Sequence, residues 1–208
     1  MAMSSRQQSA IARLIRDFLL SLPNLVRTGW GRRGVPPTLQ ETVAVHSFGV
    51  AGLALFLAIL EKSLGTRINP ERAAVLGLLH DLQEVETGDL PRPFDEILEE
   101  LGVKKESVER KARERQEQDL PPPLKKALRD ILEEFLRAET PEAQIAKDAD
   151  NLQAGIMAWR LVAQGFNTHD IVHATRRELR TQSATMVWDW IFLSQPGSNT
   201  EPPQLPAP

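Results

Sequence analysis

The segment LLHDLQEVETGDLP, residues 78–91, places a histidine and an aspartate side by side at the end of an apolar run, as His80 and Asp81. Glu84 follows His80 by four residues, so on a helix these two side chains share one face. Adjacent helical residues point about 100° apart, but His80 and Asp81 can still converge where a helix ends. Burying such groups without a partner is costly. We therefore expect them to be paired or to bind a metal ion.

Two further polar side chains lie in apolar helical sequence. His46 stands at the start of the longest apolar run, and Asp150 lies within IAKDADNLQAGIMAW. Together with His80 and Asp81 they form a mixed set of nitrogen and oxygen ligands, which suits Mn, Co, Fe, Ni or Zn better than Mg. Four protein ligands on an ion that prefers six leave about two positions for water or substrate. This set predicts a catalytic metal site, although a lone histidine in an apolar helix is more often a core residue bonded to the backbone.

Asp148 competes with Asp150 for the fourth ligand position. Two residues apart on a helix, the two side chains point about 200° apart, so only one of them can reach the ion. Apolar residues at helical spacing surround both positions. The periodicity therefore does not choose between them.

Composition narrows the class of protein. The chain has 208 residues and a net charge of −3, which disfavours non-specific binding to nucleic acid. It contains no cysteine and no tyrosine, so disulfides and thiolate zinc sites are excluded, and the expected compartment is a reducing cytoplasm. The apolar run 43–60 is about long enough to span a membrane. Because it contains His46 and lacks flanking aromatic and basic anchors, we expect a buried helix of a soluble protein.

The pattern along the chain predicts an all-α protein with neither strands nor internal repeats. We expect a single domain over residues 1–195 and a disordered, proline-rich tail at 196–208. Residues 24–40 read as a loop. The segment 104–118 is charged almost all round and reads as a solvated helix held by charge pairs four residues apart, with a recognition role as the alternative. Expected caps are Asn69, Thr140 and Thr168. The expected helices are 11–22, 41–63, 70–81, 94–101, 104–118, 121–136, 141–162 and 168–193.

Two other patterns carry less weight. GWGRRG, residues 29–34, fits a dinucleotide-binding glycine motif, but no strand precedes it. Its glycines could still let backbone amides approach a phosphate, with Arg32 or Arg33 supplying charge; the alternative is a surface loop. His169 and His173 are four residues apart and could form a metal pair on a helix. The family resemblance given below implies instead that they are surface residues, because they follow Asp150.

The ordered set of a histidine, an HD pair and a later aspartate in a helical chain resembles the HD-domain metal-dependent phosphohydrolases. The segments VRTGW (26–30), ETVAVHSFGVA (41–51), LLHDLQEVETGDLP and KDADNLQ (147–153) resemble the branch of the bacterial 5′-deoxynucleotidases and their archaeal and eukaryotic relatives. The resemblance covers about residues 10–190. It implies an HD-domain helical bundle and the metal ligands His46, His80, Asp81 and Asp150.

The resemblance also implies roles at the substrate. Glu84 is the implied residue that positions or deprotonates the attacking water, and Asp89 is implied at the sugar. Arg27 and Trp30 lie where this branch places an arginine and a tryptophan near the substrate. Val45 stands where that branch usually has an acidic residue, and the insert after Trp30 also departs from the deoxynucleotidases. These departures concern nucleotide specificity rather than the metal.

The resulting prediction is a 5′-nucleotidase that hydrolyses (deoxy)nucleoside monophosphates with one divalent transition metal, by attack of an activated water. We expect a cytoplasmic homodimer that binds neither nucleic acid nor membrane. One alternative is a phosphodiesterase or another hydrolase of small phosphate esters. The other is a non-catalytic module that binds a metal or a nucleotide.

Overall fold

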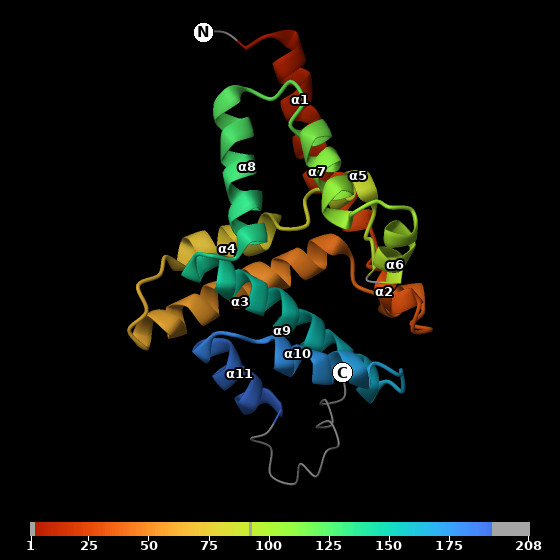
Figure 1. Ribbon diagram of the computed structural model, residues 1–208, viewed down its shortest axis with the longest axis vertical. Coiled ribbons are helices and arrows are strands. Elements are labelled where there is room, and N and C mark those ends of the chain that lie inside the picture. Colours follow the sequence, from red (N-terminus) through yellow and green to blue (C-terminus); the bar gives the residue numbers. More distant parts are fainter. Residues whose placement is uncertain (1–2, 92, 193–208) are drawn as a thin grey trace. The chain divides into compact units, whose positions relative to one another are not determined.

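A computed structural model describes residues 3–91 and 93–192 of the chain (Figure 1). Within these ranges the regular structure is helical, and the only extended pairing is an isolated antiparallel bridge between Val26 and Thr42. The predicted all-α class is confirmed. The predicted tail at 196–208 lies outside the described residues.

The chain divides into two compact units. Unit 1 comprises residues 1–45 and 80–132, and unit 2 comprises residues 46–79 and 133–208. The prediction of a single domain over residues 1–195 stays a prediction.

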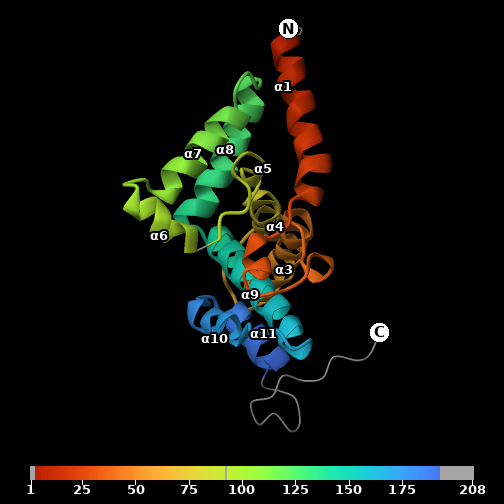
Figure 2. The same cartoon turned by 90° about the vertical axis from the view of Figure 1, so that its right-hand side faces the viewer.

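Unit 2 is organised around one long helix, α9 (Pro141–Ala163), which packs against α4 (Pro70–Leu79), α10 (His169–Glu178) and α11 (Gln182–Phe192). Both ribbon views show α10 and α11 beside α9 (Figures 1 and 2). Most of α3 (Val43–Ser63) also belongs to this unit. The core is built from apolar residues of these helices, including Val50, Ala54, Leu57, Ile145, Ala149 and Leu152.

Two glycines allow close helix packing in unit 2. A Cβ atom at Gly77 of α4 would lie 3.2 Å from the carbonyl oxygen of Val50 on α3. A Cβ atom at Gly155 of α9 would lie 2.7 Å from Oγ1 of Thr175 on α10. The distance at Gly155 is too short for a real side chain, so a larger residue there would displace Thr175 or α10, whereas the distance at Gly77 is tight and would require a shift of a few tenths of an ångström.

Two of the three predicted N-caps are confirmed. The Asn69 side chain accepts a hydrogen bond from the Arg72 amide at 3.0 Å, and Thr140 Oγ1 accepts one from Ala143 at 3.1 Å. Thr168 precedes α10, but its hydroxyl donates to the carbonyl of Ala158 at 2.7 Å instead of capping the helix.

The predicted helix over 168–193 is wrong, because α10 and α11 are separate. The Asp148 carboxylate accepts hydrogen bonds from the amides of Arg180 and Thr181 at 2.7 to 3.1 Å and from the Thr181 hydroxyl at 2.7 Å. It therefore satisfies donors at the start of α11, whose amides have no partner within the helix.

Unit 1 contains shorter elements. α1 (Ser5–Arg16) starts earlier than expected, at a capping box of Ser4 and Gln7, and continues through a π-helical turn (Asp17–Ser21) and a 3₁₀ turn (Leu22–Asn24). The predicted loop 24–40 contains α2 (Thr28–Gly31) and a 3₁₀ turn (Pro37–Leu39). The remaining helices are α5 (Glu84–Thr87), α6 (Pro93–Glu100), α7 (Lys105–Gln116) and most of α8 (Pro122–Arg137).

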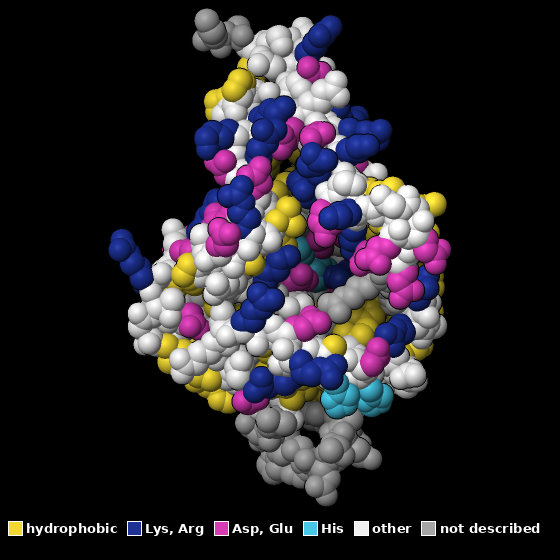
Figure 3. Space-filling view, viewed as in Figure 1, with side chains coloured by type: hydrophobic (Ala, Val, Ile, Leu, Met, Phe, Trp, Pro, Cys, Tyr) yellow, Lys and Arg dark blue, Asp and Glu magenta, His cyan; other side chains and the backbone are white. Residues whose placement is uncertain are grey.

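The charged segment 104–118 contains a helix as predicted, but the predicted solvation does not extend over its whole surface. Acidic and basic side chains are interspersed over α7 and α8 (Figure 3). One side of α7 nevertheless packs inward, where Ala112 and Gln116 are each 4% exposed. The Gln116 amide donates to the Leu82 carbonyl at 2.7 Å, which fixes α7 against the segment that leads into α5.

The long apolar helix α3 is only partly buried. Among the described helices it alone is long and apolar enough to cross a membrane, a test that core helices also pass, and 39% of its most apolar window is buried. The inward face includes Val50 and Leu57. Phe48 and Phe56 are 77% and 67% exposed, so the prediction of a buried helix is wrong for that face.

Candidate metal centre and active site

His46 is fully buried in the first turn of α3 and has a fixed ring orientation. Its Nδ1 lies 2.6 Å from Oε1 of Gln153 on α9. Because an amide oxygen can only accept, Nδ1 donates this hydrogen bond, and Nε2 is left for other partners. Gly49 makes room for this contact, since a Cβ atom there would lie 3.1 Å from Cγ of Gln153. Sequence reasoning missed Gln153, although it shares a helical face with Asp150.

The Nε2 atom of His46 faces Asp150. It lies 3.1 Å from Oδ1 of Asp150, whose side chain is 28% exposed. With a neutral ring and its proton on Nδ1, two acceptor atoms would face each other, so the arrangement requires either a doubly protonated ring or a cation. The pair therefore has the chemistry of two metal ligands.

Asp148 points elsewhere. It is 1% exposed, and its carboxylate is committed to the start of α11. Burial raises its pKa above the usual range, while the hydrogen bonds from Thr181 and Arg180 oppose that shift. Of the two aspartates that periodicity could not separate, Asp150 is therefore the one that lies against His46.

His80 and Asp81 follow the last residue of α4 directly. His80 is 5% exposed, and its Nε2 lies 3.0 Å from Oδ2 of Asp81. Because the helix has already ended, the two neighbouring side chains can converge, as the sequence suggested.

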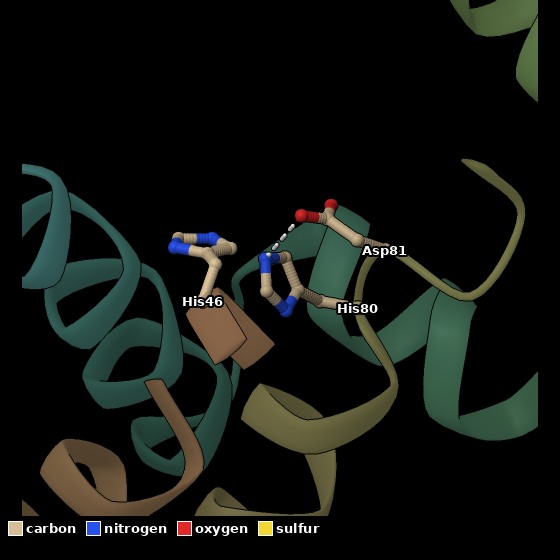
Figure 4. Close-up of side chains that lie close together, drawn as sticks. All are labelled: His46, His80 and Asp81. Atoms are coloured by element: carbon tan, nitrogen blue, oxygen red, sulfur yellow. Dashed lines mark ion pairs between the residues drawn. The ribbon is translucent and has the colours of Figure 1, made fainter. Parts of the chain in front are cut away.

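The candidate ligand atoms of His46, His80 and Asp81 all lie within 4.8 Å of one another (Figure 4). Two imidazoles and a carboxylate, with Asp150 beside His46, match the ligand preferences of a divalent transition metal. The residues present thus fit such an ion.

Glu84 opens α5 and sits in an unusual electrostatic environment. Its Oε2 is buried and has no hydrogen-bond partner. Burial raises the pKa of Glu84 to about 10; the charges of Asp81 and Asp89 add to this shift, and Arg27 and Lys105 oppose it. Without a metal ion nearby, the raised pKa therefore leaves this carboxyl group protonated at neutral pH.

Asp89 is hydrogen-bonded to Thr28, the residue that follows Arg27. The Thr28 amide donates to Oδ2 of Asp89, and the Thr28 hydroxyl lies 2.7 Å from the same oxygen and 3.0 Å from the Asp89 carbonyl. Gly88 supports the turn with a φ of 72°, which a residue with a side chain adopts only at a cost. Sequence reasoning missed Thr28, although it lies within the VRTGW motif.

The other substrate candidates differ in burial. Trp30 is 4% exposed, and its indole N–H donates to Oε1 of Glu41 at 3.2 Å, so the ring packs within unit 1. Arg27 is half-buried, whereas Arg32 and Arg33 are exposed. Their roles at the substrate stay predictions. The predicted surface positions of His169 and His173 are confirmed.

Two residues of α7, Lys105 and Glu109, share charged neighbours with Glu84. Lys105 lowers the pKa of both glutamates, and Asp81 raises both. The Lys105 ammonium donates to the Leu90 carbonyl at 3.0 Å and lies 3.7 Å from Oδ1 of Asp95. Burial raises the pKa of Glu109, with Lys105 and Arg113 opposing the shift. Sequence reasoning missed both residues, because no apolar stripe marks this face of α7.

A family model described as 5′-deoxynucleotidase YfbR-like matches residues 18–188. The chain belongs to this family. It is 34% identical to a 5′-deoxynucleotidase of Vibrio cholerae over 142 residues, which cover 66% of this chain and 70% of the relative. The predicted membership of the 5′-deoxynucleotidase branch is confirmed.

Solved structures extend the comparison of this YfbR-like chain. A conserved hypothetical protein of Pyrococcus furiosus aligns with a TM-score of 0.69 and 29% identity, covering 86% of this chain and 95% of that one. An HD-domain phosphohydrolase of Listeria innocua aligns with a TM-score of 0.60 and 21% identity, covering 81% and 76%. The predicted HD-domain fold is confirmed.

Proposed function

We propose that this YfbR-like protein is a metal-dependent 5′-nucleotidase that hydrolyses (deoxy)nucleoside monophosphates. Family membership supports the reaction class. The observation that carries the proposal is the buried group of His46, His80 and Asp81, whose donor atoms lie within 4.8 Å of one another.

In this proposal His46, His80, Asp81 and Asp150 hold one divalent ion, with Mn, Co, Fe, Ni and Zn as candidates. When bound, such an ion polarises a phosphoryl oxygen and lowers the pKa of a nearby water. Gln153 keeps the His46 ring in the tautomer that exposes Nε2.

Glu84 handles the proton of the attacking water. A positive charge beside its carboxyl group favours the ionised form, which can orient the water and accept its proton. The water oxygen forms a new bond to phosphorus and the bond to the 5′-oxygen breaks. The leaving oxygen then takes up a proton, which Glu84 can return.

The substrate contacts come from the two loops that Thr28 and Asp89 join. Arg27, near Glu84, is placed to attract the phosphate, and Arg32 and Arg33 add positive charge from the end of α2. Asp89 accepts a hydrogen bond from a sugar hydroxyl. Glu41 links Trp30 to the Arg27 segment, because its side chain accepts from the Trp30 indole and its carbonyl accepts from the Arg27 amide.

The test is phosphate release from a panel of nucleoside monophosphates and a sugarless monoester, each with single divalent metals after chelation. We expect metal-dependent release from the 5′-monophosphates. A preference for phosphodiesters would favour the alternative hydrolase. Tight nucleotide binding with no product at any metal would instead make the protein a binding module.

We also propose that the protein works in the cytoplasm as a homodimer on free nucleotides, and binds neither nucleic acid nor membrane. The net charge of −3 supports the absence of non-specific nucleic-acid binding. The exposed apolar face of α3, with Phe48, Phe56 and Ile59, is the kind of surface that a subunit interface covers. Light scattering at several protein concentrations tests the dimer. A strictly monomeric mass would contradict it.

A further inference from the structure

Lys105 reaches the loop that carries Asp89. It is the first residue of α7, and its ammonium donates to the carbonyl of Leu90, the residue directly after Asp89, at 3.0 Å. The Lys105 side chain is 29% exposed, so its stem is largely covered and its conformations are restricted. A cation that binds a backbone carbonyl makes a stronger hydrogen bond than a neutral donor does.

The Asp89 loop is thus held from two sides within unit 1. Thr28 binds the carboxylate of Asp89, and Lys105 binds the next carbonyl along the chain. The loop follows Gly88, whose positive φ ends α5, so helical hydrogen bonds do not fix its direction. The contact to Lys105 therefore restricts the rotation of the peptide that links Leu90 to Pro91, one residue beyond Asp89.

The helix that carries Lys105, α7, is held in place by packing within unit 1. Further along α7, Ala112 and Gln116 are buried on the same side, and Gln116 donates to the Leu82 carbonyl two residues before α5. These contacts hold α7 in place. The hydrogen bond from Lys105 to the Leu90 carbonyl then holds the Asp89 loop against α7.

We propose that Lys105 is a positioning residue for Asp89 and so a determinant of sugar recognition. This inference rests on the proposed function, in which Asp89 meets the sugar. Lys105 acts through the Leu90 carbonyl and does not itself touch the substrate.

The first experiment measures the loop directly. Lys105→Met keeps the stem and removes the ammonium, Lys105→Arg keeps the charge, and Lys104→Met changes the exposed neighbour as a matched control. Amide hydrogen exchange of the peptide spanning residues 86–91 should be about tenfold faster in Lys105→Met, as expected for loss of a charged hydrogen bond. Lys105→Arg and Lys104→Met should stay close to wild type. Equal exchange in Lys105→Met and Lys104→Met overturns the inference.

The second experiment is a double-mutant cycle with Asp89→Asn, measured as kcat/KM on a deoxynucleoside monophosphate. Lys105→Met should lower this value about tenfold in the wild type but less than about twofold when Asp89 is already changed. A purely structural weakening would lower activity equally in both backgrounds, and that result overturns the inference. Metal content and thermal unfolding of each variant show that the fold is intact.

The two proposals fail in different ways. If the wild-type protein releases no phosphate from any nucleotide, the proposed function is wrong. Exchange of the 86–91 peptide with a deoxynucleoside monophosphate present then decides the inference. Protection in the wild type that Lys105→Met loses supports it, and unchanged protection overturns it.

Discussion

The two units position their functional groups in different ways. In unit 2, His46, Asp150 and Gln153 lie on α3 and α9, two long helices whose neighbouring residues form the apolar core. In unit 1, Glu84 and Asp89 lie on one short helix and the turn that follows it. A packed core fixes ligand directions, whereas short elements leave substrate-binding groups dependent on a few polar contacts.

The two units also differ in how they satisfy the hydrogen-bonding needs of a buried carboxyl group. Asp148 in unit 2 accepts hydrogen bonds from two backbone amides and a hydroxyl. Glu84 in unit 1 keeps a buried oxygen without a partner, and so does Gln83 beside it. An unpaired buried polar group costs about 1–3 kcal/mol of stability. The hydrogen bonds of Asp148 therefore stabilise the fold, whereas the unpaired oxygen of Glu84 lowers its stability.

The largest expected effect is on the ligands in unit 2. His46→Ala should remove the bound metal and lower kcat by at least about 10³-fold, because the ion contributes several kcal/mol of transition-state stabilisation. Elemental analysis and steady-state kinetics measure both. His169→Ala, at an exposed histidine of α10, is the control. Full metal content in the His46 variant would contradict the ligand assignment.

Glu84→Gln separates the proposed acid–base role of Glu84 from metal binding. Metal content should stay unchanged while kcat falls by about 10²–10⁴-fold, the usual contribution of acid–base catalysis. Glu86→Gln changes an exposed carboxylate on the same short helix and should have little effect. Loss of metal in Glu84→Gln would make Glu84 a ligand instead.

Asp148→Ala tests whether this aspartate serves stability alone. Deleting the cap leaves the amides of Arg180 and Thr181 without their partner, so the free energy of unfolding should fall by about 2–3 kcal/mol. Denaturant unfolding measures the change, with the exposed Asp130→Ala as control. Metal content should be retained, and its loss at wild-type stability would reverse the roles of Asp148 and Asp150.

Thr28→Val should have a smaller effect, confined to substrate recognition. Valine keeps the shape but removes the hydroxyl beside Asp89, so kcat/KM for nucleotides should fall by about 1 kcal/mol, roughly fivefold. Thr38→Val, at an exposed threonine of the same region, should match the wild type. An unchanged kcat/KM would mean that Thr28 does not hold Asp89 for the substrate.

The last prediction concerns pH and the metal-free protein. The folded state raises the pKa of Glu84 from 4.5 to about 10, so over this range the folded chain holds a proton that the unfolded chain releases. The free energy of unfolding should therefore decrease as pH rises through this interval. Thermal unfolding of the chelated protein at several pH values measures the slope, which Glu84→Gln should flatten. The same slope in both proteins would contradict the raised pKa.

The sequence by itself determined the residue types of the site and most of the helices. Apolar spacing and local caps such as Asn69 and Thr140 act over three or four residues, so a linear pattern contains them. The order of His46, His80-Asp81 and Asp150 is also a property of the linear chain. With the segments around these residues, it indicates the 5′-deoxynucleotidase branch without any knowledge of the fold, and the family match bears this out.

Periodicity left Asp148 and Asp150 open, and the resemblance implied Asp150. Only the tertiary structure shows what Asp148 does instead, because its partners lie 32 and 33 residues further along the chain. Those same hydrogen bonds divide the predicted last helix in two. Thr28 meets Asp89 across 61 residues, and Lys105 meets Leu90 across 15. Periodicity reports which face of a helix is apolar, but it does not report which distant donor a polar side chain will find. The partner of a polar side chain depends instead on how the helices pack. Packing brings Lys105 to the Leu90 carbonyl, and it leaves one oxygen of Glu84 without a partner.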